Sequence, residues 1–140
     1  MPYRKVGYIE QCFYIIKYAI ADKVRKRKER RTAKAIESAL HIKLTDMQKQ
    51  YIFGRSEWTL TGRCTGKTTA YCIKICISEG DAIVIRFGQM PPQFLDGLNT
   101  SWYNRFYTCE FLRIYKALSK TNIRLREVKI EDAGRSKNIC

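Results

Sequence analysis

Apolar residues recur at spacings of three and four along the first part of the chain. Ile9, Phe13, Ile16 and Ile20 follow this spacing, which places them on one face of a helix. A run of charged residues follows, and the composition then becomes helical again up to about residue 42. The pattern predicts helix over residues 7–42, either as one long helix or as two helices with a break near Thr32.

Shorter patterns follow residue 43. Thr45 is the predicted N-cap of a short helix, with Gln48 as its capping-box partner, and Gly54 is its expected stop. Residues 57–61 are prone to β structure and lead directly into a glycine-containing loop. Residues 67–78 then have the apolar spacing of a helix.

The second half of the chain alternates between strand and helix patterns. Residues 82–87 are short, β-branched and almost continuously apolar, which is typical of a strand buried on both faces. A long loop is expected over residues 88–99, a helix from Thr100 or Ser101 to about Ser119, a last strand over residues 123–130 and a frayed tail from residue 134. This order predicts an α/β fold with a short parallel sheet over residues 44–140 and a basic helical extension over residues 1–43.

Charge indicates the kind of partner. The 140 residues include 27 Lys or Arg and 13 Asp or Glu, a net charge of +14, which favours nucleic acid, a ribonucleoprotein or an acidic membrane surface. Hydrophobic residues make up 45% of the chain, which argues against global disorder. The densest basic run is predicted to contact phosphates, or alternatively to be a solvated helical face, and consists of Arg25, Lys26, Arg27, Lys28, Arg30 and Arg31.

The cysteines and the hydropathy of the chain indicate in which cellular compartment the protein is expected. The six cysteines include no Cys-x-x-Cys pair and His41 is the only histidine, so the sequence does not predict a structural zinc site. The start of the chain lacks the pattern of a signal peptide, which favours the cytoplasm and free thiols. No apolar run approaches the roughly 20 residues that a transmembrane helix needs.

The strongest chemical signal lies in residues 62–69. Its glycines would let successive backbone N–H groups turn toward a phosphate at the start of a helix. Lys67 would reach the phosphates and the Thr68 hydroxyl would help to hold Mg²⁺. The usual pattern is a glycine, four further residues and then Gly-Lys-Thr, which places the first glycine five positions before Gly66; Thr61 stands there and Gly62 comes one residue later. The alternative is an ordinary helix start at residues 66–69.

A family resemblance enters through these residues. Residues 44–48, the short helix, the β-prone run and the loop together resemble the entry to helicase-like and phage terminase large-subunit ATPase domains, over roughly residues 42–90. The resemblance implies ATP and Mg²⁺ as cofactors, Gln48 near the adenine and Arg63 near the phosphates. The implied cofactor-binding set is Gln48, Gly62, Arg63, Cys64, Thr65, Gly66, Lys67, Thr68 and Thr69.

Such an ATPase also needs an acidic pair after an apolar strand. Glu131 and Asp132 are the candidates, although Lys129 interrupts the preceding apolar run and a solvated strand end is the alternative. We therefore expect a small basic P-loop nucleotide-binding protein that acts on nucleic acid, with weak or no ATPase activity. The alternative is a non-catalytic, phage-type protein that binds nucleic acid or a ribonucleoprotein, such as an inhibitor of a host defence nuclease. A protein partner or a homo-oligomer also fits, whereas a membrane partner fits less well because no lipidation motif is present.

Overall fold

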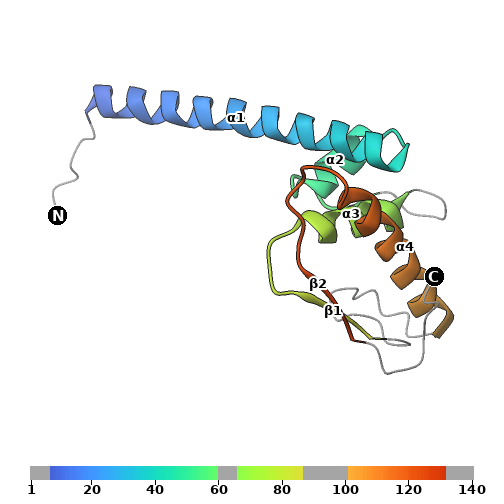
Figure 1. Ribbon diagram of the computed structural model, residues 1–140. Coiled ribbons are helices and arrows are strands. Elements are labelled where there is room, and N and C mark those ends of the chain that lie inside the picture. The colour runs from blue at the N-terminus through green and yellow to red at the C-terminus, as the bar shows by residue number, and fades with distance from the viewer. Residues whose placement is uncertain (1–6, 60–65, 87–100, 132–140) are drawn as a thin grey trace.

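The computed structural model describes residues 7–59, 66–86 and 101–131, without the side chains of residues 101–105. Figure 1 shows a long helix that projects from a body of three shorter helices and two strands. In chain order the elements are α1 (Tyr8–Leu40), α2 (Asp46–Ile52), α3 (Lys67–Ile77), β1 (Ile83–Arg86), α4 (Ser101–Leu118) and β2 (Val128–Glu131). The described fold is mixed and mostly helical.

The basic N-terminal segment forms one continuous helix. α1 has 33 residues, so it is about 50 Å long, and it continues through Thr32 without a break. It ends at His41, whose φ of 53° lies in the left-handed region and whose N–H donates to the carbonyl of Glu37. Only Ala33, Ile36 and Leu40 of this helix are buried. The last turns of α1 therefore belong to the core, while its first two-thirds project from the body.

The capping box predicted for the second helix is confirmed. The hydroxyl oxygen of Thr45 accepts from the Gln48 N–H at 3.2 Å, and Gln48 Oε1 accepts from the Thr45 N–H at 2.9 Å. Each bond satisfies a donor that a helix start leaves without an intrahelical acceptor. α2 ends at Ile52, and the left-handed Gly54 follows with φ of 71°.

The predicted parallel sheet is present as a two-stranded pair. β1 and β2 run parallel with Ile83 opposite Val128 and Arg86 opposite Glu131, and α4 connects them. Ile83 and Ile85 are buried while Arg86 is exposed, so β1 buries one face rather than both. The expected loop at residues 88–99 and the tail from residue 134 lie outside the described residues.

Two strand predictions are wrong in extent. In the β-prone run 57–61, residues 57–59 form no strand and residues 60 and 61 lie outside the described ranges, and the last strand covers only Val128–Glu131 instead of residues 123–130. The reason in the second case is visible, because the Arg126 N–H donates to the carbonyl of Cys76 at 2.8 Å. The backbone at Arg126 is thus tied to the end of α3, and pairing with β1 begins only at Glu127, whose carbonyl accepts from the Ile83 N–H at 2.8 Å. Residues with an intrinsic preference for β structure form a sheet only where a neighbouring strand lies in register to pair with them.

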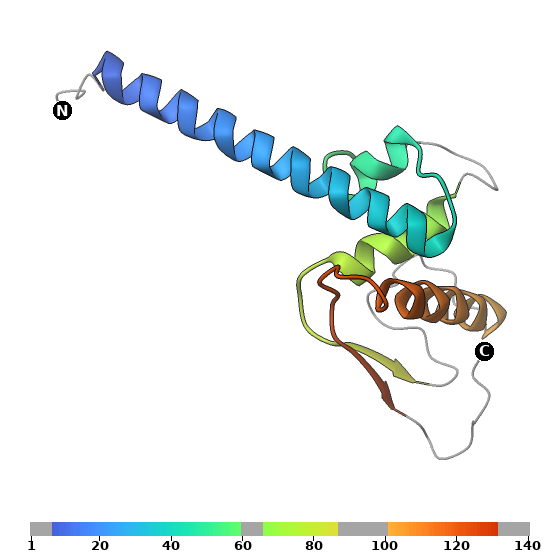
Figure 2. The same ribbon diagram turned by 45° about the horizontal axis from the view of Figure 1, so that its top comes forward.

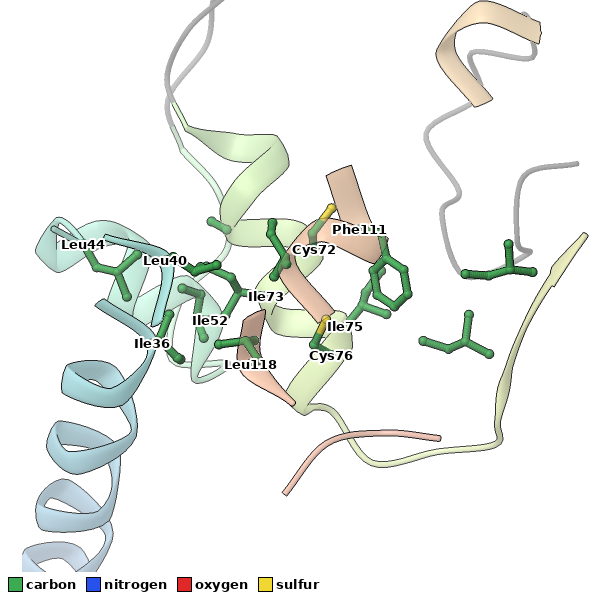
Figure 3. Close-up of a cluster of buried hydrophobic side chains, with 14 residues drawn as sticks. Ile36, Leu40, Leu44, Ile52, Cys72, Ile73, Ile75, Cys76, Phe111 and Leu118 are labelled. Carbon is green, nitrogen blue, oxygen red and sulfur yellow. The ribbon is translucent and has the colours of Figure 1, made fainter. Parts of the chain in front are cut away.

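The hydrophobic core lies where four helices and β1 meet (Figure 3). α4 contributes Phe111, Ile114 and Leu118, all fully buried, and packs against α3. Burying a side chain of this size contributes about 1.5–3 kcal/mol. The other buried members come from α1 to β1 and include Ile36, Leu40, Leu44, Ile52, Ile73, Cys76, Ile83 and Ile85. This core holds the start of α3 and the base of α1 in one unit.

Candidate functional site

The described part of the predicted phosphate loop is the start of α3. Gly66 is the N-cap residue and has φ of 76° and ψ of 13°. Lys67 is exposed, and Thr68 and Thr69 are half-buried. The first intrahelical bond runs from the Ala70 N–H to the Gly66 carbonyl at 3.0 Å, so the preceding N–H groups are the donors that favour a phosphate at a helix start. Gly62, Arg63, Cys64 and Thr65 lie outside the described residues.

Gln48 links α2 to this helix start. Its side chain is buried, and Nε2 donates to the carbonyl of Gly66 at 3.4 Å while Oε1 accepts from Thr45. A Cβ atom on Gly66 would push the Nε2 end of the Gln48 side chain aside, and the φ of Gly66 independently favours glycine. Gln48 therefore positions Gly66. The Nε2 and Oε1 atoms of the Gln48 amide are both hydrogen-bonded within the protein. The contact with adenine that the resemblance implies therefore stays a prediction.

The acidic candidate lies elsewhere in the fold. Glu131 is the last residue of β2, is exposed, and accepts a hydrogen bond from Arg86 Nε at 2.6 Å. Figures 1 and 2 both show the C-terminal ends of β1 and β2 well away from the start of α3. The structure therefore does not bring Glu131 together with Lys67. Asp132 lies outside the described residues.

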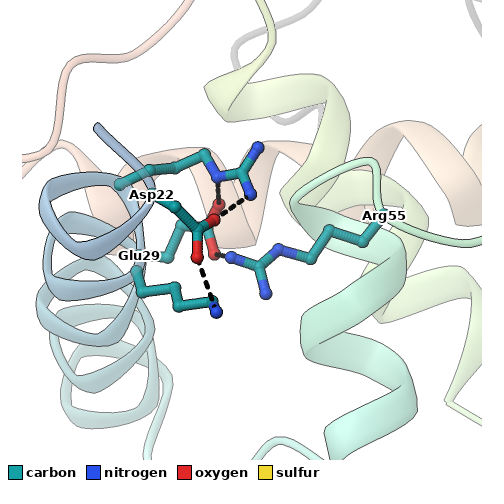
Figure 4. Close-up of polar contacts among 5 residues, drawn as sticks. Asp22, Glu29 and Arg55 are labelled. Carbon is teal, nitrogen blue, oxygen red and sulfur yellow. Dashed lines mark hydrogen bonds and ion pairs between the residues drawn. The ribbon is translucent and has the colours of Figure 1, made fainter. Parts of the chain in front are cut away.

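The basic run, residues 25–31, divides into two groups. Arg25 and Lys26 both pair with Asp22, Lys26 at 2.6 Å, and Arg25 also lies 3.9 Å from Glu29. Glu29 in turn pairs with Arg55 after α2, which ties α1 to the body (Figure 4). The remaining cations are exposed and make no ion pair among the described residues: Arg27, Lys28, Arg30 and Arg31.

An open cleft of about 1150 Å³ lies between α1 and residues 122–127. Lys28 and Arg31, one helical turn apart, line its α1 side. Arg124 and Arg126 line the opposite side. Arg126 is held in place, because Nε donates to the carbonyl of Asp81 at 2.6 Å. We call this feature the basic cleft.

Three glutamates also line the basic cleft, and two are paired with cations. Glu29 pairs with Arg55 and Arg25, and Glu127 lies 3.6 Å from Lys129. Glu79 makes no ion pair among the described residues. Four lining cations thus face one unpaired carboxylate, which leaves an excess of positive charge in the cleft.

Arg124 and Arg126 were not among the site residues predicted from the sequence. The signal that could have identified them is the alternation of apolar and basic residues from Ile123, in a segment predicted to be a strand. In the structure Ile123 and Leu125 pack against the core, and Arg124 and Arg126, which alternate with them, line the cleft. The alternation therefore identified the two faces of this segment, but sequence alone did not show that α1 lies across from it.

The cysteines within the described ranges are two buried thiols, one half-buried thiol and one bonded residue. Burial raises the pKa of Cys72 to about 12, and burial likewise raises the pKa of Cys76. Such thiols are poor nucleophiles. Cys109 is disulfide-bonded, so the expectation of free thiols is wrong for this residue; pairing depends on two Cα atoms lying about 4.4–6.8 Å apart, which sequence does not show. The described residues contain no cluster of three His, Cys, Asp or Glu side chains that could hold a metal ion.

Within the described ranges, no helix combines the length and the apolar character that are needed to cross a bilayer. Comparisons of the chain with protein-family models, with curated proteins and with solved structures find no match. The relationship to P-loop ATPases is therefore not confirmed, and function is inferred from residues and geometry alone.

Proposed function

We propose that this protein binds the phosphate backbone of nucleic acid in the basic cleft without catalysing a reaction on it. The observation that supports the proposal is that Lys28 and Arg31 of α1 line the same open cleft as Arg124 and Arg126. These cations come from segments almost 100 residues apart in the chain. They meet because the base of α1 is packed into the core through Ile36.

The chemistry of the lining fits a polyanion better than a small neutral ligand. Lysine and arginine bind phosphate through charge, and the planar guanidinium can also form two parallel hydrogen bonds. Arg126 is held by Asp81 and Ser78, so less side-chain freedom is lost when a phosphate binds. Contacts of this kind position a backbone and carry little sequence information. We therefore expect affinity that depends strongly on salt and weakly on base sequence.

The test measures the salt dependence of binding. Labelled single-stranded and double-stranded oligonucleotides of mixed sequence are titrated with the full chain between about 50 and 200 mM salt. The double variant Arg31→Gln and Arg124→Gln removes one cation from each side of the basic cleft. The slope of log K against log salt should become shallower by about 1.5, because each lost phosphate contact contributes roughly 0.7–0.9.

A matched control separates the cleft from net charge. The double variant Lys43→Gln and Lys116→Gln also lowers the charge by two, at exposed positions that do not line the cleft. It should leave the slope within error of that of the unmodified protein. Equal slopes for both double variants would show that binding follows total charge and would refute the cleft.

A second candidate function is nucleotide binding at the start of α3. The left-handed Gly66, held against Gln48, supports it, because this geometry directs backbone N–H groups of the first turn outward. Lys67 and the Thr68 hydroxyl would hold a phosphate chain and its Mg²⁺; bound nucleotide would supply the phosphoryl group that ATPases transfer. We propose binding without efficient hydrolysis, because Glu131 is paired with Arg86 at a distance from Lys67.

Calorimetric titration with ATP and Mg²⁺ tests this second function. Lys67→Ala should abolish binding, whereas Lys74→Ala, on the same helix with its ammonium 4.3 Å from the Tyr51 ring centroid, should retain it. Unchanged affinity in Lys67→Ala, or no heat with the unmodified protein at millimolar nucleotide, would rule out the site. Either result would leave the basic cleft unaffected.

A further inference from the structure

The projecting part of α1 exposes many large apolar side chains. Between Tyr8 and Val24, nine large apolar side chains are each 56–81% exposed. None of them packs against the body, since only Ala33, Ile36 and Leu40 of α1 are buried. A contiguous exposed surface of this kind marks an interaction site, because isolated helices gain most of their stability from packing.

Four of these residues form a seam with the spacing of a coiled coil. Ile9, Phe13, Ile16 and Ile20 are separated by four, three and four residues, which is the alternation of the two core positions in a heptad. All four side chains are at least 56% exposed. The seam has four core positions and ends at Ile20, because the next core position is Lys23. It therefore offers a self-complementary surface of defined length.

We propose that the seam pairs with the same seam of a second copy of this chain in an antiparallel helix pair. The register that fills both seams sets Ile9 opposite Ile20 of the second copy, and Phe13 opposite Ile16 of the second copy. Each layer then holds a pair of large side chains, and no layer joins an apolar residue to a charge. The overlap covers about 14 residues, or roughly 21 Å of helix.

Charge favours the antiparallel direction. Glu10 and Lys17 flank the same edge of the seam and are both exposed. In the antiparallel register Glu10 lies beside Lys17 of the second copy, so two opposite-charge pairs form along that edge. A parallel pair would instead set the two basic runs side by side, with six cations in each. The antiparallel pair places each basic run beyond the start of the other helix and holds the two bodies at opposite ends.

The distribution of aromatics favours a protein partner over a lipid surface. Tyr14 and Tyr18 lie on the side of α1 opposite the seam and are 60% and 72% exposed. A helix that lies in a membrane interface has one apolar face and a strongly charged face. Residues 8–24 lack that separation, so a pair or bundle of helices suits them better.

Sedimentation equilibrium of the full chain tests the association. The unmodified protein should have twice the 16.5 kDa chain mass, and Ile16→Arg, in the middle of the seam, should reduce it to one chain mass. Ala21→Arg introduces the same residue on the other side of the exposed helix and should remain dimeric. Circular dichroism checks that both variants fold, which is expected because neither side chain is buried. An unmodified protein that is monomeric, or equal dissociation of both variants, would overturn the proposal.

Cross-linking tests the direction. In a Cys12→Ser parent, a mixture of Ile9→Cys and Ile20→Cys chains should form a disulfide-linked heterodimer on oxidation, and the parent alone should not. Ile9→Cys alone should not cross-link, because its two copies lie about 16 Å apart in the antiparallel register, beyond the reach of a disulfide. Cross-linking of Ile9→Cys alone would indicate a parallel pair. Binding of a monomeric chain to anionic vesicles that is lost in Ile16→Arg but kept in Ala21→Arg would show that lipid covers the seam, and either result would refute the proposal.

Discussion

Replacing Gly66 with alanine should destabilise the protein by about 2–3 kcal/mol. The left-handed conformation at φ of 76° costs a residue with a Cβ atom about 1–2 kcal/mol. The new Cβ would also displace the amide of Gln48, whose hydrogen bond to the Gly66 carbonyl contributes roughly 0.5–1.5 kcal/mol. The prediction therefore has a backbone part and a contact part, which can be measured separately.

The separation uses urea unfolding, followed by far-ultraviolet circular dichroism, of Gly66→Ala, Gln48→Ala and the double variant. Without the Gln48 side chain the contact part disappears, and Gly66→Ala should then cost only about 1–2 kcal/mol. A coupling of about 1 kcal/mol between the two positions is expected, as is typical of residues in contact.

Gly54 provides the matched control. Its φ of 71° is nearly that of Gly66, but a Cβ atom there would meet nothing within 4 Å. Gly54→Ala should therefore cost about 1–2 kcal/mol, and this cost should be unchanged when Gln48 is replaced. If Gly66→Ala and Gly54→Ala cost the same and neither couples to Gln48, the contact between α2 and the start of α3 does not constrain Gly66, and the reasoning is refuted.

Two further predictions concern titratable groups. The N–H of Leu44 donates to Glu37 at 3.0 Å and lowers the pKa of that carboxyl. The ionised Glu37 therefore stabilises the fold above the usual pKa of 4.5, and this stabilisation is lost as pH falls through the lower pKa of the folded state. In urea unfolding at several pH values, Glu37→Gln should reduce the loss of stability at acid pH, and an unchanged loss would contradict this. At about pH 8, a thiol reagent should modify the half-buried Cys12 in the folded chain but reach Cys72 and Cys76 only after unfolding, because burial raises both of their pKa values. Mass spectrometry measures the rate at each cysteine, and modification of either buried thiol as fast as Cys12 would contradict the prediction.

Local signals were enough to predict several elements. The capping box at Thr45 and Gln48 needs only residues three apart, and the structure contains both of its hydrogen bonds. The β-branched residues of β1 and the helix that precedes it were also recognisable from short windows. Whether residues 7–42 form one helix or two was left open by the sequence. The continuous α1 settles it, with the body supporting only its last turns.

Features that depend on contacts between residues far apart in the chain could not be predicted from short sequence windows. Residues 123–127 have the alternation of a strand, but the hydrogen bond from Arg126 to Cys76 holds them beside α3. The role of Arg124 in the basic cleft depends on α1 lying across from it. Similarly, the order of Lys67 and Glu131 along the chain suggested one site, whereas the fold places them apart.

The parallel pairing of β1 with β2 has a consequence for the order of folding. Every paired position, from Ile83 and Val128 to Arg86 and Glu131, joins residues 45 apart in the chain. Closing a flexible loop of that length costs roughly 3 kcal/mol in entropy, compared with about 1 kcal/mol for a short hairpin. A pair of four-residue strands recovers little of that cost by itself, since β2 is largely exposed. The sheet should therefore form after α3 and α4 have docked, and variants that weaken Phe111 should slow folding more than variants in β2.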